Sequence, residues 1–96
     1  IGRLLTMQAA WKLDQGDFAR SDISIAKIHA ADTLHIAADT AIQLLGARGY
    51  SKDTIVEWIY RYARQARLVD GASEIHKMVL SRAYLSEGQD FFRWGV

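Results

Sequence analysis

The stretch DISIAKIHAADTLHIAADTAIQLL, from Asp22 to Leu45, decides the fold. Two series of mostly apolar residues recur along it at heptad spacing: Ile28, His35 and Ile42, and Ala31, Ala38 and Leu45. This spacing predicts one long amphipathic helix, about 36 Å in length. Because its apolar stripe is rich in alanine, a neighbouring helix can approach closely. We therefore expect this helix to be a member of a helix bundle.

A shorter amphipathic helix is predicted before this stretch. Its apolar residues are spaced by three and four: Leu4, Leu5, Ala9 and Leu13. The helix is expected to end near Gly16, since glycine readily adopts a left-handed C-terminal cap. Ser21 and Asp22 are suitable N-caps for the long helix.

Two further helices are predicted after the long one. Residues 46–51 interrupt the apolar pattern with two glycines, and Thr54 with Glu57 has the spacing of a capping box at the start of a third helix. A second interruption over residues 69–74 separates this helix from a fourth that carries Ile75 and Val79. Four helices joined by short links predict an all-α fold, an antiparallel four-helix bundle.

The composition agrees with helix and excludes several classes of protein. There is no proline, and half of the residues are hydrophobic. The absence of cysteine excludes disulfides, thiolate zinc sites and a cysteine nucleophile. Twelve Lys and Arg against eleven Asp and Glu give a net charge of +1, which provides no strong attraction to nucleic acid or anionic lipid. Asp32, Asp39 and Gln43 interrupt the longest apolar run, so no membrane span is expected.

The length of 96 residues corresponds to one small domain, residues 1–96. The chain begins at Ile1 without a methionine and enters a helical pattern at once, which indicates a piece of a longer protein. Such a chain has little interior for a cofactor pocket, so any site is expected to be shared with other domains or subunits. Aromatic residues gather in its tail, residues 87–96. No targeting segment is visible, so the compartment stays open.

Three local patterns have a chemical interpretation that we reject. One helical face carries Asp32, His35 and Asp39. A carboxylate-bridged metal site needs a second such motif, which the sequence lacks, so we expect no metal. We expect instead a half-buried histidine that is hydrogen-bonded to a flanking Asp. Arginines alternate with aromatics over residues 60–67, which we interpret as an outer face with local salt bridges rather than a nucleic-acid site. Residues 46–49 lack a preceding strand, so they are not a dinucleotide fingerprint, and an ordinary helix end is preferred to a phosphate site.

Asp70 and Gly71 lie just before the fourth helix, and two interpretations of Asp70 stay open. As an N-cap, its carboxylate would accept hydrogen bonds from amides of the first turn. As a functional group, it would be a carboxylate presented to a substrate at a sharp turn.

Five segments in order resemble the C-terminal helical domain of the acyl-CoA dehydrogenases, over about residues 4–85. These segments are residues 9–16, 25–27 and 41–50, the pair Arg61 and Arg64, and residues 70–76. The pattern Asp-Gly-x-x-Glu-x-His of residues 70–76 is similar to a subgroup with Asp at the position of the base, which includes kinase-fused members.

The resemblance implies a flavoenzyme that oxidises an acyl-CoA thioester to the 2,3-enoyl-CoA. A carboxylate removes an α-proton while the β-hydrogen leaves as hydride to the flavin of FAD. Asp70 aligns with the glutamate that is the base in many members. Asp is one methylene shorter, which reduces its reach by about 1.5 Å. Some relatives place the base on an earlier helix.

The resemblance also implies a cofactor site shared between subunits. Gln43 and Gly46 match a motif that contacts the FAD of a neighbouring subunit, and Ala47 replaces a second glycine. Glu74 occupies the place of a flavin-contacting glutamine. The implied partners are an acyl-CoA substrate, electron-transfer flavoprotein or another acceptor, and further copies of the chain in a homodimer or homotetramer. The chain alone is expected to be inactive.

A second hypothesis belongs to a different class. The chain can be a helical protein-interaction module without catalytic activity, with its aromatic tail docking a partner. Flavin absorbance of the full-length protein distinguishes the two hypotheses.

Overall fold

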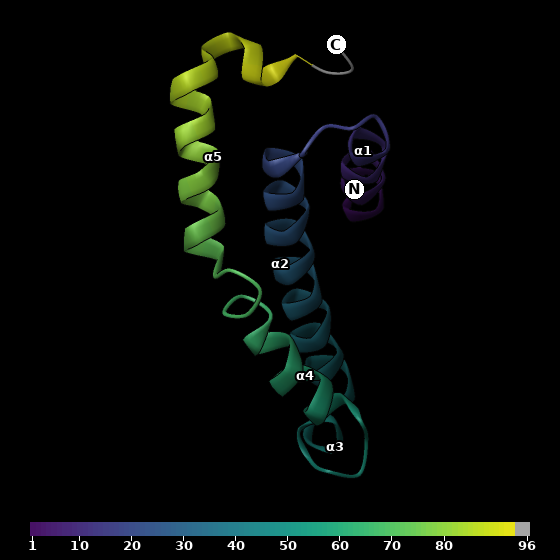
Figure 1. Ribbon diagram of the computed structural model, residues 1–96. Coiled ribbons are helices and arrows are strands. Elements are labelled where there is room, and N and C mark those ends of the chain that lie inside the picture. Colours follow the sequence, from purple (N-terminus) through teal and green to yellow (C-terminus); the bar gives the residue numbers. More distant parts are fainter. Residues whose placement is uncertain (94–96) are drawn as a thin grey trace. The chain divides into compact units, whose positions relative to one another are not determined.

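The computed structural model describes residues 1–93, and these form helices joined by short links (Figure 1). In chain order the elements are α1 (Gly2–Asp14), α2 (Arg20–Leu45), α3 (Ala47–Tyr50), α4 (Val56–Gln65), α5 (Ser73–Glu87) and the 3-10 helix η1 (Gly88–Phe92). No strand occurs among the described residues. The all-α prediction is confirmed. Trp94, at the end of the aromatic tail, lies outside the described residues.

The described residues divide into two compact units, with the division inside α2 between Ile28 and His29. Unit 1 contains α1, the first turns of α2, α5 and η1. Unit 2 runs from His29 to Ala72 and contains the rest of α2 with α3 and α4.

The end of α1 is a glycine cap, as the sequence predicts. Gly16 has φ +87°. Its amide donates to the carbonyl of Leu13 at 3.0 Å, and the amide of Asp17 donates to the carbonyl of Lys12 at 3.1 Å. This pair of bonds is the Schellman motif, which satisfies carbonyls that the last helical turn leaves without partners.

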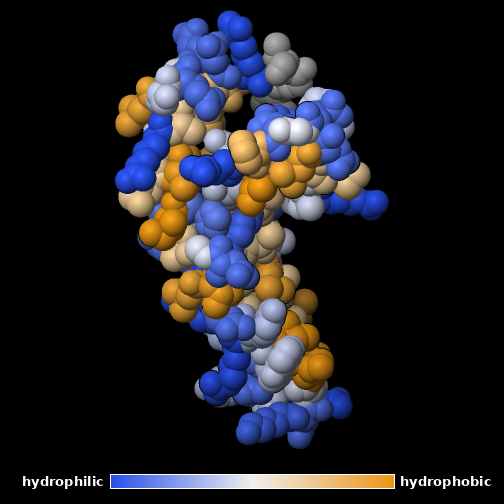
Figure 2. Space-filling model, viewed as in Figure 1, coloured by the Kyte–Doolittle hydropathy of each residue, from blue (hydrophilic) through white to orange (hydrophobic). Residues whose placement is uncertain are grey.

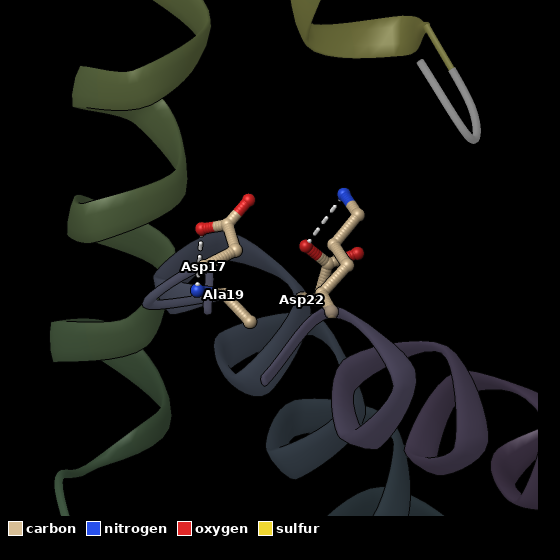
Figure 3. A network of polar contacts seen from close by, with 4 residues as sticks. Asp17, Ala19 and Asp22 are labelled. Atoms are coloured by element: carbon tan, nitrogen blue, oxygen red, sulfur yellow. Dashed lines mark hydrogen bonds and ion pairs between the residues drawn. The ribbon is translucent and has the colours of Figure 1, made fainter. Parts of the chain in front are cut away.

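The start of α2 differs from the prediction, since the helix begins at Arg20 and not at Ser21 or Asp22. Asp17 lies before it, and its Oδ1 accepts a 2.9 Å hydrogen bond from the amide of Ala19, which has a left-handed φ of +51° (Figure 3). Asp22 lies within the first turn, and its Oδ2 accepts from Nζ of Lys12 on α1 at 2.9 Å. The predicted cap therefore pairs with a neighbouring helix, and the turn before it is held by Asp17.

Residues 46–51 are not the plain interruption that the sequence suggests, because Ala47–Tyr50 form the single-turn helix α3. Gly46 joins α2 to α3 with φ 67° and ψ −146°, a region populated almost only by glycine. Gly49 is required for a different reason. A Cβ at this position would lie 2.8 Å from Cβ of Leu45 and 3.1 Å from Cα of Ile42, so α3 packs directly on the last turn of α2.

The capping box predicted at the start of α4 is wrong. The helix begins at Val56, and the preceding residue, Ile55, makes no side-chain cap. Oγ1 of Thr54 accepts a long bond of 3.4 Å from the amide of Val56. Glu57 does not reach back to the cap, because its carboxylate accepts a 2.8 Å bond from Nε of Arg61.

Small residues form the buried positions of the described chain. The buried hydrophobic residues are Ala9, Ala19, Ala31, Ala38 and Ala63. Many large hydrophobic side chains stay exposed, and orange patches are visible over the surface in Figure 2. Within residues 1–93, none of the helices combines the length and the apolar character needed to cross a bilayer.

Candidate functional site

The turn before α5 holds Asp70 in an unusual backbone conformation. Asp70 has φ +53° and is followed by Gly71 with φ +82°, so two successive residues are left-handed. Aspartate is one of the residues that tolerate this region, and strained positions of this kind gather at functional sites. The Asp70 residue is exposed. The helix begins at Ser73, so Ala72, and not Asp70, directly precedes it. The turn thus presents a carboxylate at the surface of unit 2.

The segment Gln43–Ala47 forms the end of α2 and the start of α3. Gln43, Gly46 and Ala47 are all exposed. The amide of Gly46 donates to the carbonyl of Ile42 at 2.9 Å, and that of Gly49 donates to the carbonyl of Gly46 at 3.0 Å. These amides are engaged within the chain, which favours the helix-end interpretation over a phosphate site.

Unit 2 does not bring Asp70 and Gln43 together. Gln43 lies in the last turn of α2, before α3 and α4, and Asp70 follows the C-terminal end of α4. A helix of ten residues between them spans about 15 Å. Within this chain, the candidate base and the candidate cofactor residue therefore belong to two separate surfaces.

Glu74 belongs to unit 1, in the first turn of α5, and is exposed. A carboxylate in this position is favoured by the positive end of the helix dipole. The remaining candidate site residue is thus also presented at the surface.

His35 contacts an aromatic ring rather than a ligand cluster. Its ring centroid lies 5.4 Å from that of Tyr60, with an angle of 41° between the planes. Nδ1 of His35 is buried without a hydrogen-bond partner, so the expected hydrogen bond to a flanking Asp is not made at this atom. Across residues 1–93, no three His, Asp or Glu side chains gather as a metal site.

The arginine-rich face of α4 contains a local ion pair. The Glu57 carboxylate raises the pKa of Arg61, first through the hydrogen bond to its guanidinium and then through its charge. On the same helix, Trp58 stacks on Tyr62 with ring centroids 5.4 Å apart and planes 16° apart. Both rings are about half exposed, at 57% and 52%.

Sequence reasoning missed one polar pair in unit 1. Oγ of Ser24 on α2 lies 2.9 Å from Nδ1 of His76 on α5. Only 2% of Ser24 is exposed. The two residues are 52 positions apart in the sequence, so no local sequence signal could have found this bond.

Comparison with known proteins identifies the kind of domain. Residues 1–85 match the family model for the acyl-CoA dehydrogenase C-terminal domain. The chain is 40% identical over 90 residues to (R)-benzylsuccinyl-CoA dehydrogenase of Thauera aromatica, covering 93% of this chain and 22% of that protein. It is 42% identical over 84 residues to cyclohex-1-ene-1-carbonyl-CoA dehydrogenase of Geobacter metallireducens, covering 86% and 22%.

A third relative is the probable acyl-CoA dehydrogenase FadE2 of Mycobacterium tuberculosis, with 37% identity over 96 residues, 98% of this chain and 24% of that protein. The chain therefore spans about a fifth to a quarter of the length of these curated relatives. The match of the family model over residues 1–85 and the helical fold agree. The chain belongs to the acyl-CoA dehydrogenase C-terminal domain family.

Proposed function

We propose that the full-length protein is an FAD-dependent acyl-CoA dehydrogenase that oxidises an acyl-CoA thioester to the 2,3-enoyl-CoA. The observation that carries this proposal is the left-handed turn at Asp70 and Gly71, which presents an exposed carboxylate in a domain of this family. We assign the protein to a subgroup that has Asp at this position.

In this mechanism Asp70 is the general base. The proton on the α-carbon is acidified by the thioester carbonyl, and a carboxylate oxygen of Asp70 accepts it while the α–β double bond forms. FAD, when bound, supplies the chemistry that accepts the β-hydrogen as hydride. The left-handed backbone of Asp70 sets the direction of its Cα–Cβ bond, from which the short carboxylate extends.

The surface at the end of α2 is suited to a cofactor. Gln43 is exposed, and its amide can both donate and accept hydrogen bonds. No atom lies within 4 Å of the point where a Cβ on Gly46 would stand, so a ligand can approach the backbone there. These features fit the assignment of Gln43, Gly46 and Ala47 as residues that hold FAD.

We further propose that the active site is shared between subunits. Because α4 separates Gln43 from Asp70, one chain holds FAD through residues 43–47 and contributes Asp70 elsewhere. This arrangement requires at least a homodimer, and a homotetramer also satisfies it. Glu74 is a fourth cofactor residue, and electron-transfer flavoprotein or another acceptor reoxidises the enzyme.

A competing function is a protein-interaction module without catalysis. The exposed Trp58–Tyr62 stack favours it, since exposed aromatic patches mark contact surfaces. The absorbance of the purified full-length protein separates the two functions. A flavin spectrum supports the dehydrogenase, and a colourless protein that gains no flavin on incubation with FAD supports the module.

Replacement of Asp70 by asparagine tests the base directly. Asparagine has similar size and tolerates left-handed φ, so Asp70→Asn is expected to change stability by less than about 1 kcal/mol. The variant retains FAD and binds acyl-CoA, but reduction of the flavin by acyl-CoA under anaerobic conditions slows by about 10² to 10⁴. The measurement is loss of flavin absorbance after rapid mixing.

The matched control is Asp39→Asn, which neutralises another exposed aspartate of unit 2. The control is expected to reduce its flavin at the unmodified rate. Reduction of the Asp70→Asn flavin at a near-normal rate contradicts the assignment of Asp70 as the base.

A further inference from the structure

The hydrogen bond between Ser24 and His76 joins two helices inside unit 1. Ser24 lies in α2 and is 2% exposed, and its Oγ is 2.9 Å from Nδ1 of the half-buried His76 in α5. A buried hydroxyl that loses its partner carries a desolvation cost, so this pairing favours one mutual arrangement of the two helices.

The bond also shows which face of α5 is turned toward α2. Residues of an α-helix advance about 100° each, so Glu74 stands roughly 200° around the helix from His76. With His76 turned toward α2, Glu74 is directed to the opposite side of α5. Its exposure agrees with this direction. With the His76 face of α5 turned toward α2, the Glu74 carboxylate thus lies on the outward face.

We propose that His76, held by Ser24, is a positioning residue that directs Glu74 toward FAD. The inference rests on the proposed function and deepens it, because it assigns the orientation of one cofactor residue to a bond made elsewhere on α5. Neither Ser24 nor His76 contacts the cofactor in this scheme. Their effect on FAD passes through Glu74.

The experiment is a double-mutant cycle in the full-length protein. The apoprotein is titrated with FAD, and binding is followed by the change in flavin fluorescence for the unmodified protein, Ser24→Ala, Glu74→Ala and the double variant. Loss of one such bond is expected to weaken FAD binding about three- to tenfold in Ser24→Ala. In the Glu74→Ala background, the same Ser24→Ala change is expected to alter FAD binding by less than about twofold.

Two further variants keep the test independent of any folding defect. His76→Asn retains a polar atom near the position of Nδ1 and is expected to restore most of the affinity that His76→Leu loses. Ser81→Ala removes an exposed hydroxyl from the same helix and is the control, with FAD affinity unchanged.

The outcomes are distinct. If Ser24→Ala lowers FAD affinity equally in the presence and absence of Glu74, the bond is purely structural and the positioning role is overturned. FAD binding by the unmodified protein would then still support the proposed function. Failure of the unmodified protein to bind FAD overturns the proposed function and the positioning role together.

Discussion

At the scale of single residues, two non-glycine positions of the described chain have left-handed backbone, Ala19 and Asp70. Ala19 is 2% exposed, and its amide donates to Asp17 at the entry to α2, so it has a structural explanation. Asp70 is exposed and lies in the turn that precedes α5. Left-handed residues gather at functional sites, so the backbone of this exposed aspartate, next to the left-handed Gly71, supports the proposal that Asp70 is the base.

Gln43 carries a second prediction at this scale. In the full-length protein, Gln43→Ala is expected to weaken FAD binding three- to tenfold, since the loss of one neutral hydrogen bond costs about 0.5–1.5 kcal/mol. The residue is exposed, so helical content measured by circular dichroism stays the same.

Retention of FAD on dilution measures the effect. Gln65→Ala, an exposed glutamine at the end of α4, is the matched control and keeps the original affinity. Equal retention of FAD by Gln43→Ala and the control contradicts the placement of the cofactor at residues 43–47.

At the scale of elements, the connection between α1 and α2 is held by two polar contacts. Figure 3 shows the Asp17 carboxylate at the amide of Ala19 and the Asp22 carboxylate paired with a lysine amino group, that of Lys12. The Lys12–Asp22 pair is partly buried, with side chains 26% and 18% exposed. Together the two contacts tie the end of α1 to the first turn of α2.

Removal of the Asp17 carboxylate tests this connection. Asp17→Ala leaves the amide of Ala19 without its acceptor, so the full-length protein is expected to lose about 1 kcal/mol of stability. Thermal or urea unfolding of the variant measures the loss. Asp14→Ala, at an exposed position at the end of α1, is expected to change stability by less than about 0.5 kcal/mol, and an equal loss in both variants argues against the role of Asp17.

The sequence predicts that the longer helices exist, but it predicts their ends less well. The spacing of apolar residues and the lack of proline are sufficient for α1, α2, α4 and α5, and Gly16 marks a cap because little else tolerates its φ. The single turn α3 is shorter than any periodicity can detect. The sequence does not place the start of α2, because Asp17, Ser21 and Asp22 are all good capping residues. In the fold Asp22 pairs with Lys12 of α1, and Asp17 accepts the bond from the amide of Ala19.

The candidate site was predictable only in part. Similarity to the family indicates Asp70, Gln43 and Glu74, but not their geometry. The left-handed φ of Asp70 is a property of the folded turn, although the Asp-Gly pair is typical of turns. The Ser24–His76 bond joins residues 52 positions apart and depends on the packing of α2 on α5 in unit 1. No local pattern could reveal it.

At the scale of the whole molecule, the chain exposes large apolar side chains on several helices. Examples are Leu4 at 74%, Phe18 at 89% and Leu85 at 81% exposure. Exposed apolar area of this kind is usually covered by other domains or subunits. This exposure supports the proposal of an active site shared between copies of the chain.

The oligomeric state provides the corresponding prediction. The full-length protein is expected to elute as a dimer or larger assembly, with a mass by light scattering at least twice that of one chain. Dilution that dissociates the assembly is expected to release FAD in parallel. A monomer that retains FAD and oxidises acyl-CoA contradicts the shared site.

The alanine-lined interior has a consequence for natural variation. In most domains, relatives diverge at the surface while large core residues change slowly. In this chain every buried hydrophobic position of the described residues is alanine, including Ala63 with no exposed area. A larger side chain at such a position forces the helices apart and lowers the folding stability by about 1–3 kcal/mol. Substitutions among relatives at these positions are therefore expected to be confined to glycine, alanine and serine. The usual order of mutational tolerance is therefore reversed in this chain. Its large apolar residues, where no partner surface covers them, tolerate substitution better than its small buried ones.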